Sequence, residues 1–228
     1  MVSPLPPLSE DRPLLGIDTS TSQGGIALYD GQTLSTRSWP SGRSHTTTLL
    51  AEINQLLNRA EISVRDLAAV AIATGPGAFT GLRVGFGVAK GFHLATGVPL
   101  IGIPTLEAAA LAFASCGTPI VAVVGGGRGR VVWAWYEAST QGLRQARAPR
   151  NGTVGELIDE LNGSGPVLVT GEIAHDQTGL IDEIDGVSLP PVALRLRQPA
   201  ALAELAWRRW RAGDVDQAGA LEPVYLSR

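Results

Sequence analysis

Residues 75–87 read Gly-Pro-Gly-Ala-Phe-Thr-Gly-Leu-Arg-Val-Gly-Phe-Gly, and they join a short apolar run, residues 67–73, to a segment of helical composition. The apolar run is typical of a buried parallel strand. A glycine-rich turn between a strand and a helix gathers backbone N–H groups at the positive end of the helix, where phosphate can bind. Arg83 would add a cation at the same place. The stretch therefore predicts an α/β fold with a candidate anion site at a strand end.

The glycines also have a purely structural explanation, because a tight turn with close backbone packing needs glycine whether or not a ligand binds. The stretch is not a P-loop, because the Gly-x-x-x-x-Gly-Lys-Ser/Thr pattern is missing and the single lysine, Lys90, lies well inside the predicted helix. The glycine spacing also differs from the dinucleotide-binding fingerprint. A ligand role therefore needs a second feature.

That second feature is an acidic turn near the start of the chain. Residues 14–20 read Leu-Leu-Gly-Ile-Asp-Thr-Ser, an apolar strand that ends in a polar turn, and residues 24–31 follow as a second strand. A strand, a polar turn and a returning strand can hold phosphate and metal, although Asp-Thr-Ser is also an ordinary turn. The predicted nucleotide or phosphate site contains Asp18, Thr19, Ser20, Gly75, Gly77, Thr80, Gly81 and Arg83.

The pattern of elements repeats along the chain. Strands are predicted near 14–20, 24–31, 33–38, 69–74 and 99–103, with helices near 44–60, 80–97 and 105–115. A leaner version follows, with strands at 119–124, 130–138 and 167–170 and helices near 153–162 and 199–212. The recurrence predicts an α/β fold of the actin-like, ribonuclease H-like type, two-lobed, with a degenerate second half. We expect a flexible leader at 1–12, a first domain at 13–115, and a smaller second domain at 116–228 whose last helix and tail pack back on the first.

Several motifs, taken in order and spacing, resemble the TsaB (YeaZ) family. They are Ile17–Ser20, His45-Thr46, the Gly75–Gly85 block, Gly102–Leu106 and the closing Pro223–Leu226. The resemblance is strong over about residues 13–112. One departure is the run Gly125–Arg130, which stands where the family usually shows Asp-Ala-Arg, and which we expect to form a permissive hairpin turn.

The resemblance implies a non-catalytic bacterial subunit that binds a TsaD-type metal-binding catalytic protein. The pair would make the threonylcarbamoyl adenosine next to the tRNA anticodon. A TsaE-type P-loop ATPase would be a further partner, tRNA would be reached through the complex, and the chain alone would form a homodimer. The subunit would have no catalytic residue, metal or cofactor of its own, with ATP or ADP as a candidate ligand at the subunit interface.

The predicted helix at 80–97 carries two ridges of small residues, which let another backbone approach closely. They are Gly81, Gly85 and Ala89, and Gly87, Gly91 and Ala95. One ridge can pack on the sheet of its own domain, and the other would meet a helix of a second subunit; the alternative is that both serve internal packing. Together with the helix at 44–60, the predicted partner interface comprises His45, Leu49, Glu52, Arg83, Phe86, Gly87, Ala89, Lys90 and His93.

Two other functions would need residues that the sequence does not supply. A stand-alone actin-like ATPase or small-molecule kinase would use Asp18 and the Gly75 loop, and would need an acid in the second half where Gly125–Gly127 has none. A glycoprotein-type peptidase is opposed by the histidines, since the three present form no His-x-x-x-His metal pair.

The composition indicates the cellular compartment and the kinds of partner to expect. The net charge of −3 argues against strong independent tRNA binding. The single cysteine, Cys116, excludes an internal disulfide and favours a reducing compartment. The apolar stretches are too short for a membrane span. We therefore expect a cytoplasmic protein without a membrane partner.

Overall fold

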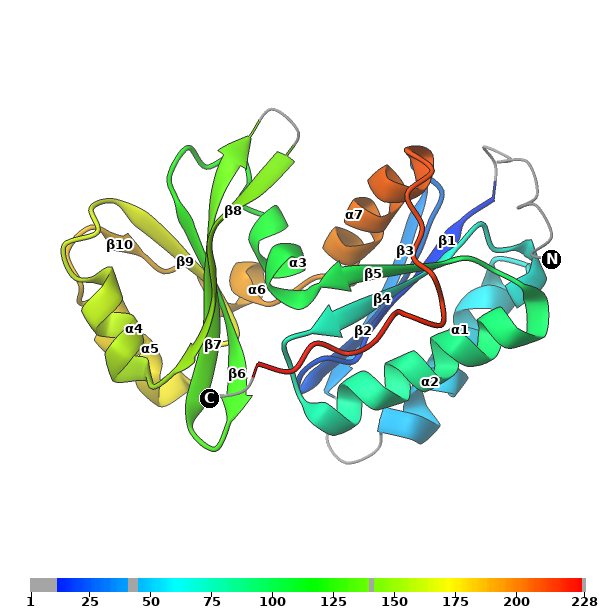
Figure 1. Ribbon diagram of the computed structural model, residues 1–228, viewed down its shortest axis with the longest axis horizontal. Coiled ribbons are helices and arrows are strands. Elements are labelled where there is room, and N and C mark those ends of the chain that lie inside the picture. Colours follow the sequence, from blue (N-terminus) through cyan, green and yellow to red (C-terminus); the bar gives the residue numbers. More distant parts are fainter. Residues whose placement is uncertain (1–11, 41–44, 140–141, 227–228) are drawn as a thin grey trace.

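The computed structural model describes residues 12–40, 45–139 and 142–226, with the side chains of residues 45–47 outside that description. The first sheet has the order β3-β2-β1-β4-β5 (Figure 1). Its strands are β1 (Leu14–Asp18), β2 (Gln23–Tyr29), β3 (Leu34–Pro40), β4 (Val70–Gly75) and β5 (Leu100–Pro104). The first three strands pair antiparallel, β4 pairs parallel with β1, and β5 pairs parallel with β4. This sheet and its helices are called the first lobe.

The second sheet repeats the topology of the first. Its strands are β6 (Ile120–Gly127), β7 (Arg130–Ser139), β8 (Gly142–Gly152), β9 (Val167–Gly171) and β10 (Val187–Ser188), in the order β10-β9-β6-β7-β8. Strands β6, β7 and β8 form an antiparallel meander, and β9 and β10 run parallel to β6. Read from β8 to β10, each strand matches its counterpart from β3 to β5. This sheet and its helices form the second lobe, and the predicted two-lobed α/β fold is confirmed.

Helices cover both faces of the first sheet. On one face, α1 (His45–Arg59) and α2 (Phe79–Thr96) share a core with the apolar side chains of β1, β2 and β4. A single 3₁₀ turn, Val64–Asp66, leads from α1 to β4. On the other face lie α3 (Thr105–Leu111) and α7 (Pro199–Arg211). Helix α3 also packs on the second sheet, through Leu106, Ala109 and Ala110, so it lies between the two lobes.

The second lobe carries its own helices on its outer face. Helices α4 (Val154–Leu161) and α5 (His175–Asp182) pack there against β6, β7 and β9. Between α5 and α7 lies the four-residue helix α6 (Val192–Arg195). The turn between β6 and β7 has Arg128 at φ 52° and Gly129 at φ 74°, a two-residue hairpin that bends the chain tightly as expected.

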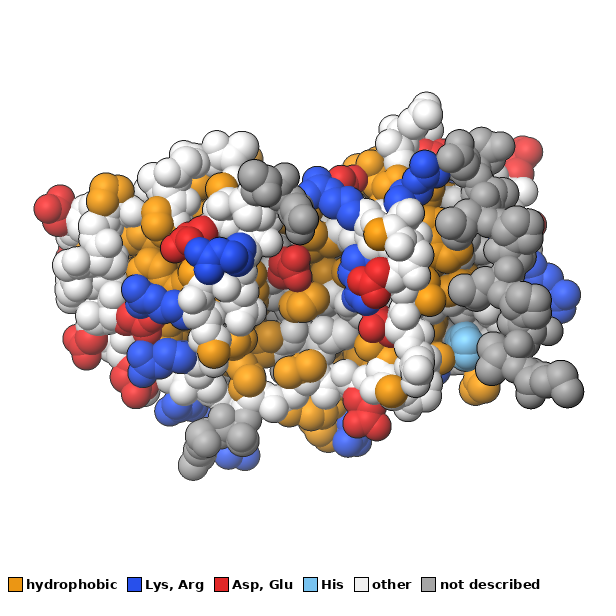
Figure 2. Space-filling view, turned by 45° about the horizontal axis from the view of Figure 1, so that its top comes forward, with side chains coloured by type: hydrophobic (Ala, Val, Ile, Leu, Met, Phe, Trp, Pro, Cys, Tyr) orange, Lys and Arg blue, Asp and Glu red, His pale blue; other side chains and the backbone are white. Residues whose placement is uncertain are grey.

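Strand β8 was not predicted, because bulges break its alternation. There are two register shifts against β7, and one of them places residues three apart in β8 opposite residues two apart in β7. Arg147 and Arg150 consequently fall on one face, with their guanidinium carbons 4.2 Å and 5.3 Å from the ring centroids of Trp135 and Trp133. Glu160 of α4 accepts hydrogen bonds from both arginines and both indole nitrogens. Figure 2 shows the resulting group of basic side chains on the second lobe.

The C-terminal tail runs across both lobes (Figure 1). In the first lobe, the amide of Val224 donates to the Thr74 carbonyl at 2.8 Å, and Tyr225 stacks on Phe79 with ring centroids 5.2 Å apart. In the second lobe, Asn151 Nδ2 donates to the Leu226 carbonyl at 3.1 Å. Within the described ranges, no helix is both long and apolar enough to span a bilayer.

The glycines of α2 separate the two ridges predicted from the sequence. Gly81, Gly85 and Ala89 are buried against the sheet, whereas Gly87 and Gly91 are exposed. A Cβ at Gly85 would lie 2.4 Å from Thr19 Oγ1 and 2.8 Å from Ile72 Cδ1, but a Cβ at Gly87 would meet no atom within 4 Å. Close packing therefore explains the first ridge and leaves the second unexplained within the described chain.

Alanine at these two positions should change stability in opposite directions. Gly85→Ala should lower the free energy of unfolding by about 1–3 kcal/mol, the usual cost of overpacking a core. Gly87→Ala should raise it by up to about 1 kcal/mol, because alanine is the better helix former and nothing obstructs it. Urea unfolding followed by circular dichroism measures both, and equal effects at the two sites would contradict this account of α2.

Candidate functional site

The two turns expected to surround a ligand lie next to each other. Strands β1 and β4 are parallel neighbours, so the turns after Asp18 and Gly75 occupy the same edge of the first sheet. The Ala78 amide donates to the Ser20 carbonyl at 2.6 Å, and the Thr19 hydroxyl donates to the Gly81 carbonyl at 2.7 Å. The two segments are thus bonded directly to each other.

The glycines of the second turn are explained by conformation at one position and by space at the other. Gly75 has φ 108°, a left-handed value that favours glycine. Gly77 is not in the left-handed region, but a Cβ there would lie 2.1 Å from the Ser20 carbonyl oxygen. Gly81 is buried in the first turn of α2. The structural explanation of this glycine run therefore suffices without a ligand.

Both carboxylate oxygens of Asp18 are bonded to groups within the protein. Its Oδ1 accepts from the Ser20 amide and hydroxyl at 2.9 Å and 2.6 Å, and its Oδ2 lies 2.8 Å from Arg197 Nε. Burial alone would raise the pKa of this carboxyl, but the charge and hydrogen bonds of Arg197, with those of Ser20, hold the pKa below its ordinary value. Asp18 is therefore a buried, ionised partner of an arginine.

Arg197 joins the two lobes. Its Nη1 donates to Glu172 Oε1 at 2.7 Å, just after β9 in the second lobe, and its Nη2 donates to Thr21 Oγ1 at 2.9 Å in the first. Thr21 Oγ1 in turn donates to Glu172 Oε1 at 2.6 Å. The Arg197 side chain is only 2% exposed. We call Asp18, Thr21, Glu172 and Arg197 the inter-lobe network.

Arg197 and Glu172 were absent from the residues predicted from the sequence. Glu172 directly follows β9, the counterpart of β4, so a strand-end carboxylate in the second half was a usable signal. Arg197 stands two residues before Pro199, which opens α7, and carries no recognisable motif. Their pairing with Asp18 and Thr21 bridges segments that are far apart in the chain, and such pairing leaves no trace in local sequence.

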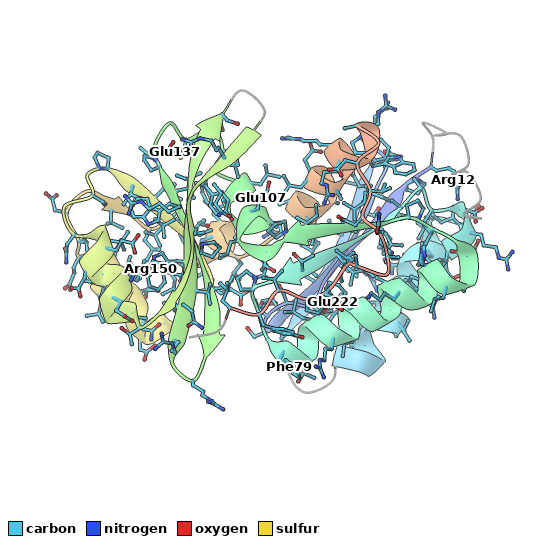
Figure 3. The ribbon with its side chains drawn as sticks, viewed as in Figure 1. Arg12, Phe79, Glu107, Glu137, Arg150 and Glu222 are labelled. Carbon is cyan, nitrogen blue, oxygen red and sulfur yellow. The ribbon has the colours of Figure 1, made fainter. Side chains whose placement is uncertain are left out.

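Several groups of the predicted phosphate or nucleotide site are already bonded within the protein. Both Asp18 oxygens have protein donors, and the Ser20 and Ala78 amides already have acceptors. Thr80 is exposed in the first turn of α2. Arg83 is exposed as well, with its guanidinium carbon 3.8 Å from the Phe79 ring centroid. Phe79 lies at the start of α2 (Figure 3). Helix α2 itself begins after Ala78 with no side-chain cap, and a phosphate or nucleotide site at these residues stays a prediction.

Three residues predicted at a partner interface lie in the core instead. Leu49, Phe86 and Ala89 are at most 5% exposed and belong to the core cluster beneath α1 and α2. The prediction was wrong for them because helical spacing shows which residues share a face but not which face meets the sheet. His45 begins α1, and its side chain lies outside the described residues.

The remaining interface residues are at least partly accessible. Glu52 and Lys90 are half-buried, and Glu52 forms an ion pair with Arg37. His93 Nδ1 lies 2.9 Å from the Val98 carbonyl oxygen, which can only accept, so this nitrogen carries the proton. Gly87 and Arg83 are exposed.

The outer side of α2 presents a smooth apolar strip. Gly87, Gly91 and Ala95 are exposed, and Cβ atoms at the two glycines would meet no atom of the described chain within 4 Å. Leu94 beside them is 84% exposed. We call Gly87, Gly91, Leu94 and Ala95 the α2 strip. Small residues at this spacing form a ridge on which another helix can pack closely.

Metal-ligating residues do not gather in the part of the chain that the structure describes: no three His, Cys, Asp or Glu side chains there could hold an ion together. The arrangement therefore offers an inter-lobe network whose charged groups are bonded to one another, and an uncovered helix surface.

Comparison with known proteins identifies a family. The family model described as TsaD, tRNA N6-adenosine threonylcarbamoyltransferase, matches residues 40–190. A protein of Escherichia coli, tRNA threonylcarbamoyladenosine biosynthesis protein TsaB, is 29% identical over 93% of this chain and 94% of its own length. The TsaB protein of Bacillus subtilis is 26% identical, with 93% of each chain covered.

Solved structures show the same fold. A structure described as YeaZ from Pseudomonas aeruginosa is 24% identical, with a TM-score of 0.76 over 94% of this chain and 100% of that one. A second structure, described as an uncharacterised protein similar to peptidase YeaZ from the same organism, gives a TM-score of 0.78 over 95% of this chain. The two-lobed α/β architecture is therefore that of the YeaZ structures.

The inter-lobe network predicts a large, pH-dependent effect of Arg197→Met. Removing the cation leaves buried carboxylates without their partner, which should lower the free energy of unfolding at pH 7 by about 3–5 kcal/mol. The low folded-state pKa of Asp18 adds stability above its ordinary value of 3.8, and that contribution is lost as the pH falls through the folded value. The difference between the variant and wild type should therefore shrink in acid.

Arg144→Met is the matched control. Arg144 pairs with Glu137 on the surface, and both side chains are largely exposed, so its loss should cost less than about 1 kcal/mol. Urea unfolding at pH 7 and pH 3.5 measures both variants. An Arg197→Met protein as stable at pH 7 as the control would show that the network does not stabilise the fold.

Proposed function

The chain belongs to the TsaB (YeaZ) family, and on that premise we propose that it takes part in threonylcarbamoyladenosine modification of tRNA as a non-catalytic subunit. It binds a TsaD-type catalytic protein and activates it toward the adenosine next to the anticodon. The names of the E. coli and B. subtilis relatives place those proteins in threonylcarbamoyladenosine biosynthesis. Their similarity extends over nearly the whole of both chains.

The observation that carries the proposal is the α2 strip. Gly87 and Gly91 each lower helix stability by about 1 kcal/mol relative to alanine, and no packing inside the described chain accounts for them. The exposed Leu94 beside the two glycines makes this surface apolar. Because the glycines have no side chains, another helix can pack closely against it. The proposed occupant is a helix of the TsaD-type subunit, or the same strip of a second copy when that subunit is missing.

The inter-lobe network supports a role without chemistry of its own. In actin-like enzymes the cleft between the lobes is the usual place for a nucleotide, but here the carboxylates from both lobes are ion-paired with Arg197. We therefore propose that any ATP or ADP belongs to the interface with the catalytic subunit. A stand-alone ATPase or small-molecule kinase finds no free acid in the Asp18 turn or in Gly125–Gly127.

Other partners follow from the same proposal. The TsaE-type P-loop ATPase would join the complex, and tRNA would contact mainly the other subunits, since this chain has a net charge of −3. The complex would act in the cytoplasm.

Leucine at Gly87 tests the proposal. Gly87→Leu should leave the chain folded, since the position is open and leucine is a better helix former than glycine. Affinity for a purified TsaD-type subunit should fall at least about tenfold, or 1.4 kcal/mol, and self-association should be lost. Titration calorimetry and light scattering measure the two effects.

Gly179→Leu is the control, because Gly179 is also an exposed glycine within a helix and has no atom within 4 Å of its Cβ, but lies on α5 of the second lobe. It should bind like wild type. If Gly87→Leu is folded and binds as tightly as Gly179→Leu, the α2 strip is not the interface. If wild type fails to bind the TsaD-type subunit at all, the proposed function itself is wrong.

A further inference from the structure

A second buried arginine lies two residues from Arg197 and has no carboxylate partner. Arg195 ends helix α6, which lies between the two sheets in Figure 1, and it is only 4% exposed. Its Nη1 donates to the Gly171 carbonyl at 3.1 Å. No acidic side chain in the described ranges forms an ion pair with it.

The inter-lobe network does not supply the missing charge. Asp18 and Glu172 are both bonded to Arg197, and the pKa of Arg195 is lowered by burial with no carboxylate offsetting it. A guanidinium has five N–H donors, and the single bond to Gly171 leaves most of them free. None of the Arg195 nitrogens is both fully buried and unbonded, so the free donors are accessible to a ligand from solvent.

Arg195 lines a pocket of about 330 Å³ between the lobes. One wall is the β1–β2 turn of the first lobe at Ser22 and Gln23, and another is Gly125 at the end of β6. The segment Glu172–His175 and α6 complete the pocket. It is large enough for a small anion with an organic substituent, and hydroxyl and amide side chains stand at its first-lobe wall.

Helix α5 begins at the same pocket. Ala174 precedes it with no side-chain cap, and no described group accepts a hydrogen bond from the amides of His175 and Asp176. Free amides at the positive end of a helix favour an anion. Asp176 itself is exposed and does not line the pocket. A buried arginine without a counter-ion and an uncapped helix start thus converge on one cavity.

We propose that this pocket binds a phosphate group, held by the Arg195 guanidinium and the amides that open α5. Phosphate fits better than a carboxylate, because it offers more acceptor oxygens to a forked guanidinium and two backbone donors. A metal–nucleotide complex does not fit, because the neighbouring carboxylates, Asp18 and Glu172, are already bound by Arg197. The source is either free phosphate or a small phosphate monoester.

Amide NMR spectra of the full wild-type chain test the proposal without any variant. The probes are inorganic phosphate and ribose 5-phosphate, each compared with sodium chloride at equal ionic strength. Both should cause saturable shifts at Gly125, His175 and Asp176, and chloride should not. Tighter binding of ribose 5-phosphate would assign the site to an ester, and tighter binding of inorganic phosphate would assign it to the free anion. No saturable shift with either probe would overturn the proposal.

Arg195→Met separates binding from structure, because it keeps the aliphatic stem and removes the charge. The variant should lose at least tenfold in phosphate affinity, while its melting temperature in phosphate-free buffer stays equal to that of wild type or rises. The exposed Arg144→Met serves as control and should bind phosphate like wild type. An Arg195→Met protein with unchanged affinity would overturn the proposal, and if this variant does not fold, the wild-type spectra decide.

Discussion

The buried ion pair of Arg197 with Asp18 and Glu172 is the contact on which the arrangement of the two lobes depends. Desolvating one cation and two carboxylates is costly, and only the complete set of hydrogen bonds, Thr21 included, offsets that cost. Arg197 stands two residues before Pro199, where α7 begins. Helix α7 then packs on the first sheet, and the tail that follows it reaches both lobes.

The polar turns of the first lobe are bonded within the protein. The turns after β1 and β4 sit at the edge of the sheet where a ligand would be held, yet their polar groups are paired with each other and with Arg197. The glycines at 75 and 77 serve backbone geometry and close approach. On the outer surface, the α2 strip has two exposed glycines, Gly87 and Gly91, whose space no described residue fills.

Local signals in the sequence were enough for much of this fold. Residues 14–18, 70–75 and 79–96 were predictable because apolar runs, glycines and helix stop signals are adjacent in the chain. Strand β8 was missed because its bulges place Arg147 and Arg150 three residues apart on one face, a spacing unlike a strand. Phe86 and Ala89 were misplaced because helical periodicity does not say which side meets the sheet. Arg197 and Glu172 were missed because their partners are distant in sequence.

Arg195 and Arg197 show how neighbouring residues of one type come to differ. Leu196 between them is extended, so the two side chains are separated by one strand-like repeat and both enter the space between the lobes. Arg197 meets carboxylates from each lobe, whereas Arg195 meets a carbonyl and an open pocket. Arg197 is thus paired with carboxylates of the protein itself, whereas Arg195 is left to pair with a bound anion. A phosphate bound there would touch α5, α6 and the first-lobe turn at Ser22, and would strengthen the junction that Arg197 already holds.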